Sequence, residues 1–500
     1  MNKSLDFIYK QQKELSTFSG IGALLGWDQM TYMPKDGAKE RAEQTSLISR
    51  LSHEKVISDE FYNHIKNLTK ENNLKNLEIT NKIVVERLEK DIEKARKIPS
   101  DFVEKMAKTT TFAYQAWEEA RMRNKFSHFS PHLKKVIELE KEYCGFINLP
   151  GHLYNNLLDD YEEGMTVDKL KNEFQFLKKE LKSIIQKIVN SSKYQNQKSF
   201  NIKISTEEQE KLCSVVIEKL NIPRNRFRLD TSTHPFTTSM GNDDVRITTS
   251  YTRQNPLFSF FSTIHEAGHA LYELGLPKGK YENTVISDSP SLGLHESQSR
   301  FWENNIARSY NFCKIIFPIF QKTVPNQLKG INLDLWYKYI NAVKPSLIRV
   351  EADELTYCLH VILRFELELL LIDDEIKVKE LPIIWNEKMD ELLGVTPKDD
   401  MEGVLQDMHW SGGSFGYFPT YAIGSIYASQ IYNKLQKSMK TFFVDIEEGR
   451  FSNILSWLRE NIHSKGRLFT SDEIIKNCCG EGLNSEIFVK YLKEKYYQIY

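Results

Sequence analysis

The feature that most constrains this fold is an apolar stretch between residues 255 and 275, which contains the motif His-Glu-Ala-Gly-His at positions 265–269. Its density of apolar residues predicts a buried helix. We expect Asn255 to cap this helix, Pro256 to occupy its first position and Gly275 to end it. The two histidines therefore lie on one well-delimited helix, which decides how they face each other.

His265 and His269 are one helical turn apart and project from one face, about 40° apart around the axis. At that spacing two imidazoles can reach a single Zn²⁺ ion at about 2.1 Å. Glu266 points about 100° to the side, where its carboxylate can take a proton from water without displacing the ion. The chain has 12 histidines in 500 residues, so the motif is expected by chance only on the order of hundredths of a time. We predict a metal site with Glu266 as general base.

The third ligand of this site stays open at this point. Tyr272 and Gly275 occupy the positions at which the pattern H-E-x-x-H-x-x-G-x-x-H requires glycine and histidine, so that pattern fails. A ligand from a following helix is the other common arrangement, and residues 294–303 read as such a helix. The downstream candidates are Glu282, Asp288, His295, Glu296 and Glu303. Spacing alone does not choose between His295 and Glu296.

The rest of the chain reads mostly as helix. In several segments apolar residues recur at three- and four-residue spacing among lysine and glutamate, which predicts amphipathic helices. These segments are 85–97, 111–126, 132–147, 167–190, 350–372 and 425–438. We find no fixed-period repeat and no linker that divides the chain, so we expect one domain over residues 1–500.

One stretch departs from the helical pattern. Residues 225–252 are rich in threonine, serine and phenylalanine, and apolar and polar residues alternate around Val245 and Ile247. Residues 241–243 (Gly-Asn-Asp) supply turn chemistry between two extended pieces. We predict a small antiparallel sheet or hairpin directly before the helix with the histidines.

The composition excludes several classes of function. The 67 basic and 68 acidic residues leave a net charge of -1, so no global field favours nucleic acid or an anionic membrane. No segment reaches about 20 uninterrupted apolar residues, and the N-terminus lacks the apolar core of a signal peptide. The six cysteines are scattered without a C-x-x-C pair, as expected of reduced thiols in the cytosol. We expect a cytoplasmic protein with no nucleic-acid or membrane partner.

Several separated blocks of the chain resemble the carboxypeptidase Taq family of thermostable zinc carboxypeptidases. They follow the family's order over nearly the whole chain and are specific in combination, and no block of the family is missing. The blocks lie at 27–34 (WDQMTYMP), 234–236 (HPF), 244–248 (DVRIT), 265–269 (HEAGH), 295–300 (HESQSR), 348–353 (IRVEAD) and 403–410 (GVLQDMHW).

The resemblance implies a mainly α-helical, neurolysin-like metallopeptidase fold with a deep groove, and we expect residues 1 to roughly 200 to form one wall. It implies Glu296 as the third ligand and one zinc ion per chain, which cobalt replaces in some members. It also implies a cytoplasmic homodimer that removes single residues from peptide C-termini with broad preference. We expect Arg300, four residues after Glu296, to be structural.

The transition state of peptide hydrolysis carries an oxyanion that needs hydrogen-bond donors besides the metal. We expect Tyr417, Tyr421 and His234 to supply them. By similarity to angiotensin-converting enzyme, His409 acts with a tyrosine of the loop around the glycine-rich stretch 411–416. The aromatic residues around that stretch favour a loop that faces a cleft, while aromatic packing in the helical core is the alternative for the two tyrosines.

A carboxypeptidase also needs a cation for the terminal carboxylate of its substrate, and an arginine binds a carboxylate with two parallel bonds. We expect Arg349 to do this, with Arg246 as the second choice. For each, an ion pair with a nearby aspartate, Asp353 or Asp244, is an equally good interpretation. Asp353 is also a candidate for orienting a metal-bound imidazole.

Two other functions compete with this interpretation. An endopeptidase of the thimet-oligopeptidase type shares the metal chemistry but has a groove that is open at both ends. A helical binding protein with a structural metal needs a fourth protein ligand, and no further cysteine or histidine at motif spacing lies near residues 265–296. The presence of Glu266 also argues against the second alternative.

Overall fold

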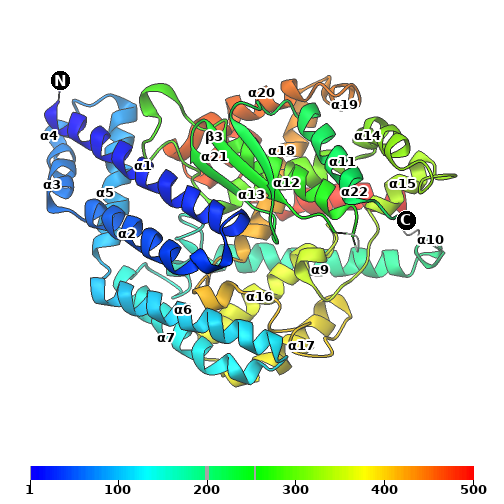
Figure 1. Ribbon diagram of the computed structural model, residues 1–500, viewed down its shortest axis with the longest axis horizontal. Coiled ribbons are helices and arrows are strands. Elements are labelled where there is room, and N and C mark those ends of the chain that lie inside the picture. Colours follow the sequence, from blue (N-terminus) through cyan, green and yellow to red (C-terminus); the bar gives the residue numbers. More distant parts are fainter. Residues whose placement is uncertain (1, 197–201, 253–254) are drawn as a thin grey trace.

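The structure, a computed structural model, describes residues 2–196, 202–252 and 255–500. It consists mainly of helices around one small sheet, which confirms the predicted fold class (Figure 1). The N-terminal helices, blue and cyan in Figure 1, lie at the left and the bottom of the view, and the sheet lies near the centre. Within the described residues, no helix is long and apolar enough to span a membrane.

The predicted helices form, with shifted ends. They are α5 (Ile79–Arg96), α6 (Ser100–Met122), α7 (Ser130–Ile147), α9 (Val167–Val189), α16 (Tyr357–Ile372) and α18 (Pro419–Ser438). α6 ends before residue 126 because Asn124 has a left-handed backbone conformation with φ 50°. α16 begins at Tyr357 rather than at 350, because the carboxylate of Asp353 accepts two backbone N–H groups just before the helix.

The sheet contains β1 (Phe227–Thr231), β2 (Thr237–Gly241) and β3 (Asp244–Thr249), in the order β1-β3-β2. The predicted turn at 241–243 joins β2 to β3, which are antiparallel. The predicted antiparallel hairpin is thus present, and β1, which pairs with β3 in parallel, is an additional strand that was not predicted. The chain leaves β1, crosses to the far edge of the sheet for β2, and returns through the middle as β3.

The helix with the histidines is α12 (Phe258–Glu273), and it lies between the sheet and the next helix, α13 (Leu292–Arg300). The predicted cap is wrong: Leu257 is the N-cap residue, without a side-chain hydrogen bond, and Asn255 and Pro256 precede the helix. The two helices approach closely at Gly268, where an added Cβ atom would lie 2.7 Å from the carbonyl oxygen of Gln298. Only glycine permits this approach, which brings α13 against the histidine face of α12.

α18 covers the other side of α13. At Gly424 an added Cβ atom would lie 2.6 Å from Cγ of Glu296, so the backbone of α18 presses directly on that side chain. The three helices α12, α13 and α18 thus form one packed unit with Glu296 in its middle. Because these side chains have little space to move, the position of Glu296 is well defined.

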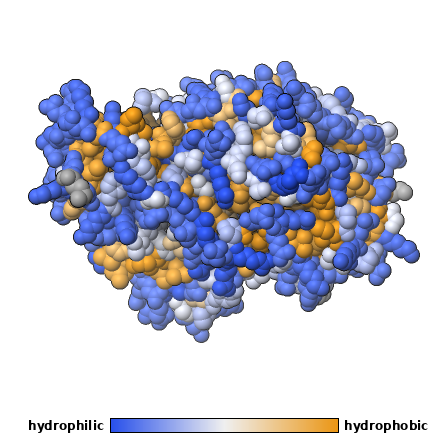
Figure 2. All heavy atoms as spheres, turned by 90° about the horizontal axis from the view of Figure 1, so that it is seen from above, coloured by the Kyte–Doolittle hydropathy of each residue, from blue (hydrophilic) through white to orange (hydrophobic). Residues whose placement is uncertain are grey.

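Most of the buried apolar side chains of the described residues belong to two clusters. The small one joins α1 (Lys3–Thr31), α3 (Asp59–Leu68) and α5 through side chains such as Ile8, and the large one includes α6 and all later helices named above. The predicted N-terminal wall, residues 1 to roughly 200, therefore contains residues of both clusters. Its end near residue 200 lies outside the described residues. On the face drawn in Figure 2, apolar side chains lie between hydrophilic ones across the middle of the molecule.

Candidate metal centre

The structure brings His265 and His269 of α12 together with Glu296 of α13, with one potential ligand atom of each within 4.8 Å of the others. Oε2 of Glu296 lies 3.4 Å from Nε2 of His265 and 3.3 Å from Nε2 of His269. Ligands at about 2.0–2.1 Å from a tetrahedral zinc ion are separated by about 3.3–3.4 Å. The two distances to Glu296 therefore match those between ligands that share one ion.

The other ring nitrogen of His265 fixes its tautomer. Nδ1 of His265 lies 2.9 Å from Oε2 of Glu303, and a carboxylate can only accept, so Nδ1 donates the hydrogen bond. In the neutral ring Nε2 then carries a lone pair and points at Glu296. Glu303 lies in a π-helical turn (Phe301–Ala307) that continues α13, and such turns are common at functional sites.

A chain of two hydrogen bonds fixes the tautomer of His269. Nε2 of His295 lies 2.8 Å from Oε1 of Glu273, so His295 donates there and its Nδ1 is left as an acceptor. Nδ1 of His269, 2.6 Å from Nδ1 of His295, is then the donor. The lone pair on Nε2 of His269 also points at Glu296. His295, one of the two open choices for the third ligand, thus lies behind a ligand rather than beside it.

Lone pairs that converge on a carboxylate oxygen repel each other unless a cation lies among them, so this donor set fits a metal ion of zinc or cobalt type. Although burial opposes it, the charge of Arg300 holds the pKa of Glu296 well below its usual range. Nε of Arg300 lies 2.7 Å from Oε1 of Glu296, which leaves Oε2 to face the imidazoles. Arg300 therefore has a structural contact, as predicted.

Asp353 does not orient an imidazole. Its carboxylate accepts hydrogen bonds from the backbone of Lys344 and from both the backbone and the hydroxyl of Thr356, all outside the metal centre. The groups that orient the ligands are Glu303 and, through His295, Glu273. Glu303 was among the residues weighed as ligands, whereas Glu273 had no signal in the sequence beyond its place four residues after His269.

Glu266 lies on the same helix but turns towards the sheet. Its Oε2 accepts a hydrogen bond of 2.6 Å from the hydroxyl of Thr237 in β2. The side chain is buried, with 7% of its surface exposed, and burial raises the pKa of its carboxyl group. A raised pKa makes this carboxylate a better proton acceptor near neutral pH. Thr237, which the sequence did not single out, holds it in place.

Two of the predicted donors, Tyr417 and Tyr421, form one aromatic cluster with His409. The rings of Tyr417 and Tyr421 are 5.3 Å apart, and His409 lies 5.4 Å from the first and 6.2 Å from the second. Nε2 of His409 is 3.3 Å from the hydroxyl of Tyr421. All three side chains are partly exposed, while Phe415 and Phe418 of the same loop are buried.

Electrostatics link this cluster to the metal centre. Burial raises the pKa of Tyr421 well above its usual value, and the nearby charge of Glu296 contributes to the rise. Burial also lowers the pKa of His409 to about 4, with Arg349 adding to the effect. The imidazole is therefore neutral and the phenol keeps its proton at neutral pH, so the hydroxyl group can donate a hydrogen bond.

Both predicted arginines are held by aspartates. Arg349 is buried, and its Nε and Nη2 lie 3.0 and 2.8 Å from Oδ1 of Asp407, not near Asp353 as expected for a helical pair. Nη1 of Arg349 lies 3.2 Å from the hydroxyl of Tyr357, and its guanidinium group lies 4.9 Å from the ring of Tyr421.

Arg246 forms the expected pair with Asp244, at 2.8 and 2.7 Å, and lies over the ring of Trp27 in α1. Thr237 is opposite Ile247 in the sheet, so Arg246 points to the other face from the one that contacts Glu266. His234 is exposed in the loop between β1 and β2. It lies three residues before Thr237.

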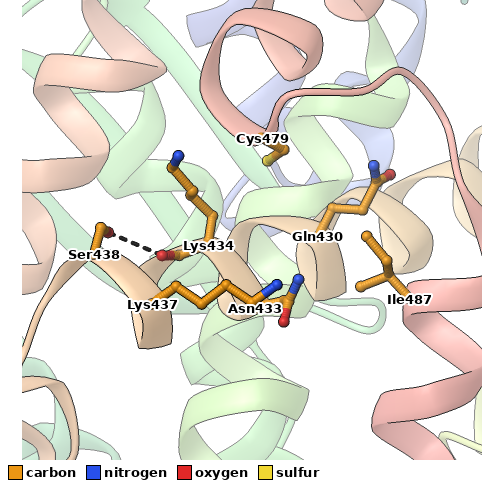
Figure 3. A pocket seen from close by; sticks show the side chains of 7 residues that line it. All are labelled: Gln430, Asn433, Lys434, Lys437, Ser438, Cys479 and Ile487. Carbon is orange, nitrogen blue, oxygen red and sulfur yellow. Dashed lines mark hydrogen bonds between the residues drawn. The ribbon is translucent and has the colours of Figure 1, made fainter.

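A hollow of about 180 Å³ lies near the far end of α18 (Figure 3). Lys434 and Lys437 line it together with Cys479 of α21 (Ser471–Cys479). Tyr421 is near the start of α18 and these lysines are several turns further on. This hollow is therefore separate from the metal centre.

Comparison with known proteins identifies the family of this chain. The family model of the carboxypeptidase Taq (M32) metallopeptidases matches residues 7–496. The thermostable carboxypeptidase 1 of Pyrococcus furiosus is 39% identical to this chain, and the match covers 99% of both proteins. Carboxypeptidase 1 of Bacillus subtilis is 38% identical, and the match covers 98% of this chain and 97% of that protein. A solved M32 carboxypeptidase from Deinococcus radiodurans superposes with a TM-score of 0.95 at 33% identity and covers 99% of both chains. The chain is therefore a metallocarboxypeptidase and belongs to the carboxypeptidase Taq (M32) family.

Proposed function

We propose that this enzyme uses one zinc ion per chain, held by His265, His269 and Glu296, to release single residues from peptide C-termini. The observation that carries the proposal is the convergence of two imidazole lone pairs on Oε2 of Glu296 at 3.3–3.4 Å. Cobalt has the same ligand preferences and is expected to substitute. The named relatives are carboxypeptidases, which favours this activity over that of an endopeptidase.

When bound, zinc polarises the scissile carbonyl and lowers the pKa of a water ligand. Glu266 is the general base that takes a proton from the attacking water and passes it to the leaving amine. The hydrogen bond from Thr237 fixes one carboxylate oxygen and leaves the other for the proton. A carboxylate whose pKa is raised by burial both accepts and releases a proton readily near neutral pH.

Hydrogen bonds from the aromatic cluster stabilise the oxyanion of the transition state. Tyr417 and Tyr421 are the proposed donors, and each is potentially worth about 3 kcal/mol. His409 contacts the hydroxyl of Tyr421 and is proposed to bind the substrate beside it. His234 stays a proposed donor on the opposite, sheet side, because its loop leads into the strand that holds Glu266.

The terminal carboxylate of the peptide requires a cation, and we propose Arg349 for this role, with Arg246 as the second choice. Arg349 is supported by its position next to Tyr421. Its guanidinium group is pre-oriented by Asp407 and Tyr357, which reduces the entropy lost on binding. Broad preference for C-terminal residues, action as a homodimer and a cytoplasmic location are part of the same proposal and rest on the family resemblance.

C-terminal laddering of a peptide mixture by mass spectrometry tests the proposal. Wild type and Glu266→Gln are compared, each metal-stripped and each reloaded with zinc. We expect reloading to restore laddering to the wild type only, while the variant binds zinc with the same stoichiometry. Activity of the stripped protein that chelators do not change would overturn the metal assignment, and rapid turnover by zinc-loaded Glu266→Gln would overturn the base assignment.

A second experiment separates the carboxypeptidase from an endopeptidase of the thimet-oligopeptidase type. One peptide is digested with a free and with an amidated C-terminus. We expect amidation to abolish cleavage, because the arginine then has no carboxylate to bind. Equal internal cleavage of both peptides would favour the endopeptidase.

A further inference from the structure

Glu368 of α16 is a fully buried glutamate outside the metal centre, with 0% of its surface exposed. Three donors point at its carboxylate. Oε1 accepts from the indole Nε1 of Trp410 at 2.7 Å, and Oε2 accepts from the backbone N–H of Gly416 at 3.0 Å and from the hydroxyl of Tyr154. Burying a carboxylate is costly unless it is hydrogen-bonded. The three hydrogen bonds offset the cost of burying Glu368.

Two of these donors enclose the glycine-rich loop. Trp410 directly follows His409, and Gly416 directly precedes Tyr417. Gly416 has a left-handed conformation with φ 86°, and an added Cβ atom there would lie 2.7 Å from the carbonyl oxygen of Leu157. Leu157 thus packs closely against the loop at Gly416, and both ends of the loop donate hydrogen bonds to the carboxylate of Glu368.

The same helix also holds the segment that leads into the loop. Arg364 lies one turn before Glu368 on α16, and its Nε lies 2.6 Å from Oδ2 of Asp407. Asp407 is two residues before His409 and also binds Arg349. α16 therefore contacts the segment from Asp407 to Gly416 at both ends, through side chains on one face of the helix.

We propose that Glu368 is a positioning residue, which holds His409 and Tyr417 in the geometry that meets the substrate. This inference rests on the roles proposed above for those two side chains. A displacement of about 1 Å in a group that contacts the transition state can cost roughly 100-fold in rate. A loop that contains several glycines does not hold such a geometry by itself. The carboxylate supplies the constraint that the loop lacks.

An amide cannot replace this carboxylate. In Glu368→Gln one oxygen becomes an NH₂ group, which then faces one of the three donors. If its remaining oxygen keeps the bonds to Gly416 and Tyr154, the amide hydrogens oppose the indole N–H of Trp410. Trp410→Phe removes that N–H and retains an aromatic ring, so it relieves the conflict. This gives a conservative rescue for the variant.

Steady-state kinetics of zinc-loaded Glu368→Gln test the proposal. They are measured at about pH 8, where the wild-type carboxylate is ionised, because burial raises the pKa of Glu368 to about 7. We expect kcat to fall roughly 10- to 100-fold, with KM and zinc content close to wild type. Trp410→Phe in the Glu368→Gln background should recover a large part of kcat, and Trp410→Phe alone is the control. A folded, zinc-loaded Glu368→Gln with wild-type kcat would overturn the proposal, because a purely structural role affects the amount of folded protein only.

Tyr417→Phe separates this inference from the proposed function. We expect it to slow the reaction by itself, and we expect Glu368→Gln to add less than its full effect in the double variant, because both changes remove the contribution of one hydroxyl. Fully additive losses would show that Glu368 does not act through Tyr417. Wild-type turnover of Tyr417→Phe would instead refute the donor role of the tyrosine, whatever Glu368→Gln does.

Discussion

Oε2 of Glu303 lies 2.9 Å from Nδ1 of His265, so a carboxylate outside the ligand set decides which imidazole nitrogen faces the metal site. Although burial opposes it, the hydrogen bond from His265 and the charges of Arg300 and Arg308 lower the pKa of Glu303 to about 2. Glu303 is therefore ionised at neutral pH. Its negative charge increases the electron density on the imidazole that it contacts.

We expect Glu303→Ala to weaken zinc binding about 10- to 100-fold, because His265 loses the partner that fixes its tautomer. Competition with a chromophoric chelator measures the affinity. Glu282→Ala, at an exposed position between α12 and α13, is the matched control and should bind zinc as the wild type does. Equal affinities for the two variants would show that Glu303 does not support the ligand.

Gly268→Ala should disturb the metal centre without touching a ligand. The added Cβ atom would lie 2.7 Å from both the carbonyl oxygen of Gln298 and Cα of Ser299, so α12 and α13 must separate. We expect a loss of about 1–3 kcal/mol in the free energy of unfolding. Zinc content after dialysis should also fall, since the histidines move away from Glu296. Thermal unfolding and metal analysis measure the two effects.

Gly145→Ala in α7 is the control for that variant. Outside its neighbouring residues and the backbone of α7, no atom lies within 4 Å of a Cβ added there. Alanine favours a helix over glycine by about 0.5–1 kcal/mol. It should leave zinc content unchanged and stability equal or slightly higher. If Gly268→Ala behaved in the same way, the close approach of the two helices would not be what sets the site.

The sequence predicted what depends on local spacing. The helices follow from apolar periodicity, and the approach of His265 to His269 follows from one helical turn. The ends of α6 and α16 depend on a left-handed Asn124 and on the carboxylate of Asp353, which periodicity does not report. The parallel pairing of β1 could not be predicted, because it depends on where the chain crosses the sheet.

The rest of the metal site depends on tertiary packing. Glu296 was assigned only through the family resemblance, since the choice against His295 requires knowledge of how α13 lies on α12. Asp353 was a candidate for orienting an imidazole because of its type and position, but Glu303 does so because a π-helical turn brings it next to His265. Thr237 contacts Glu266 only because β2 packs against α12.

Glu162 should make stability depend on pH. It is buried against the start of α13, where it accepts a hydrogen bond from the backbone N–H of Gly293, and burial raises its pKa from 4.5 to about 8. Between these values the folded state keeps a proton that the unfolded state has lost. The free energy of unfolding therefore falls as the pH rises through this window, and the loss is complete above the folded pKa.

Glu162→Gln keeps an acceptor for Gly293 but cannot ionise. We expect its apparent Tm, relative to that of the wild type, to rise steadily from about pH 5 to about pH 8 and to level off above. Both proteins are compared in the same zinc excess, so that the pH dependence of metal binding cancels. A Tm difference that stays constant over this range would mean that Glu162 titrates at its ordinary pKa.

The two arginines proposed for the substrate carboxylate should respond differently to substitution. Arg349 and its partner Asp407 have only 6% and 10% of their side chains exposed, so Arg349→Gln leaves a buried charge with fewer partners. We expect it to lose on the order of 3 kcal/mol in stability and to raise KM for peptides with a free C-terminus.

Arg246 is paired with Asp244, which is 46% exposed, and lies on the sheet face away from Glu266. Arg246→Gln should therefore cost about 1 kcal/mol or less and change KM little. Steady-state kinetics with peptides that have a free C-terminus measure KM, and denaturant unfolding measures stability. A larger rise in KM for Arg246→Gln than for Arg349→Gln would transfer the role to Arg246.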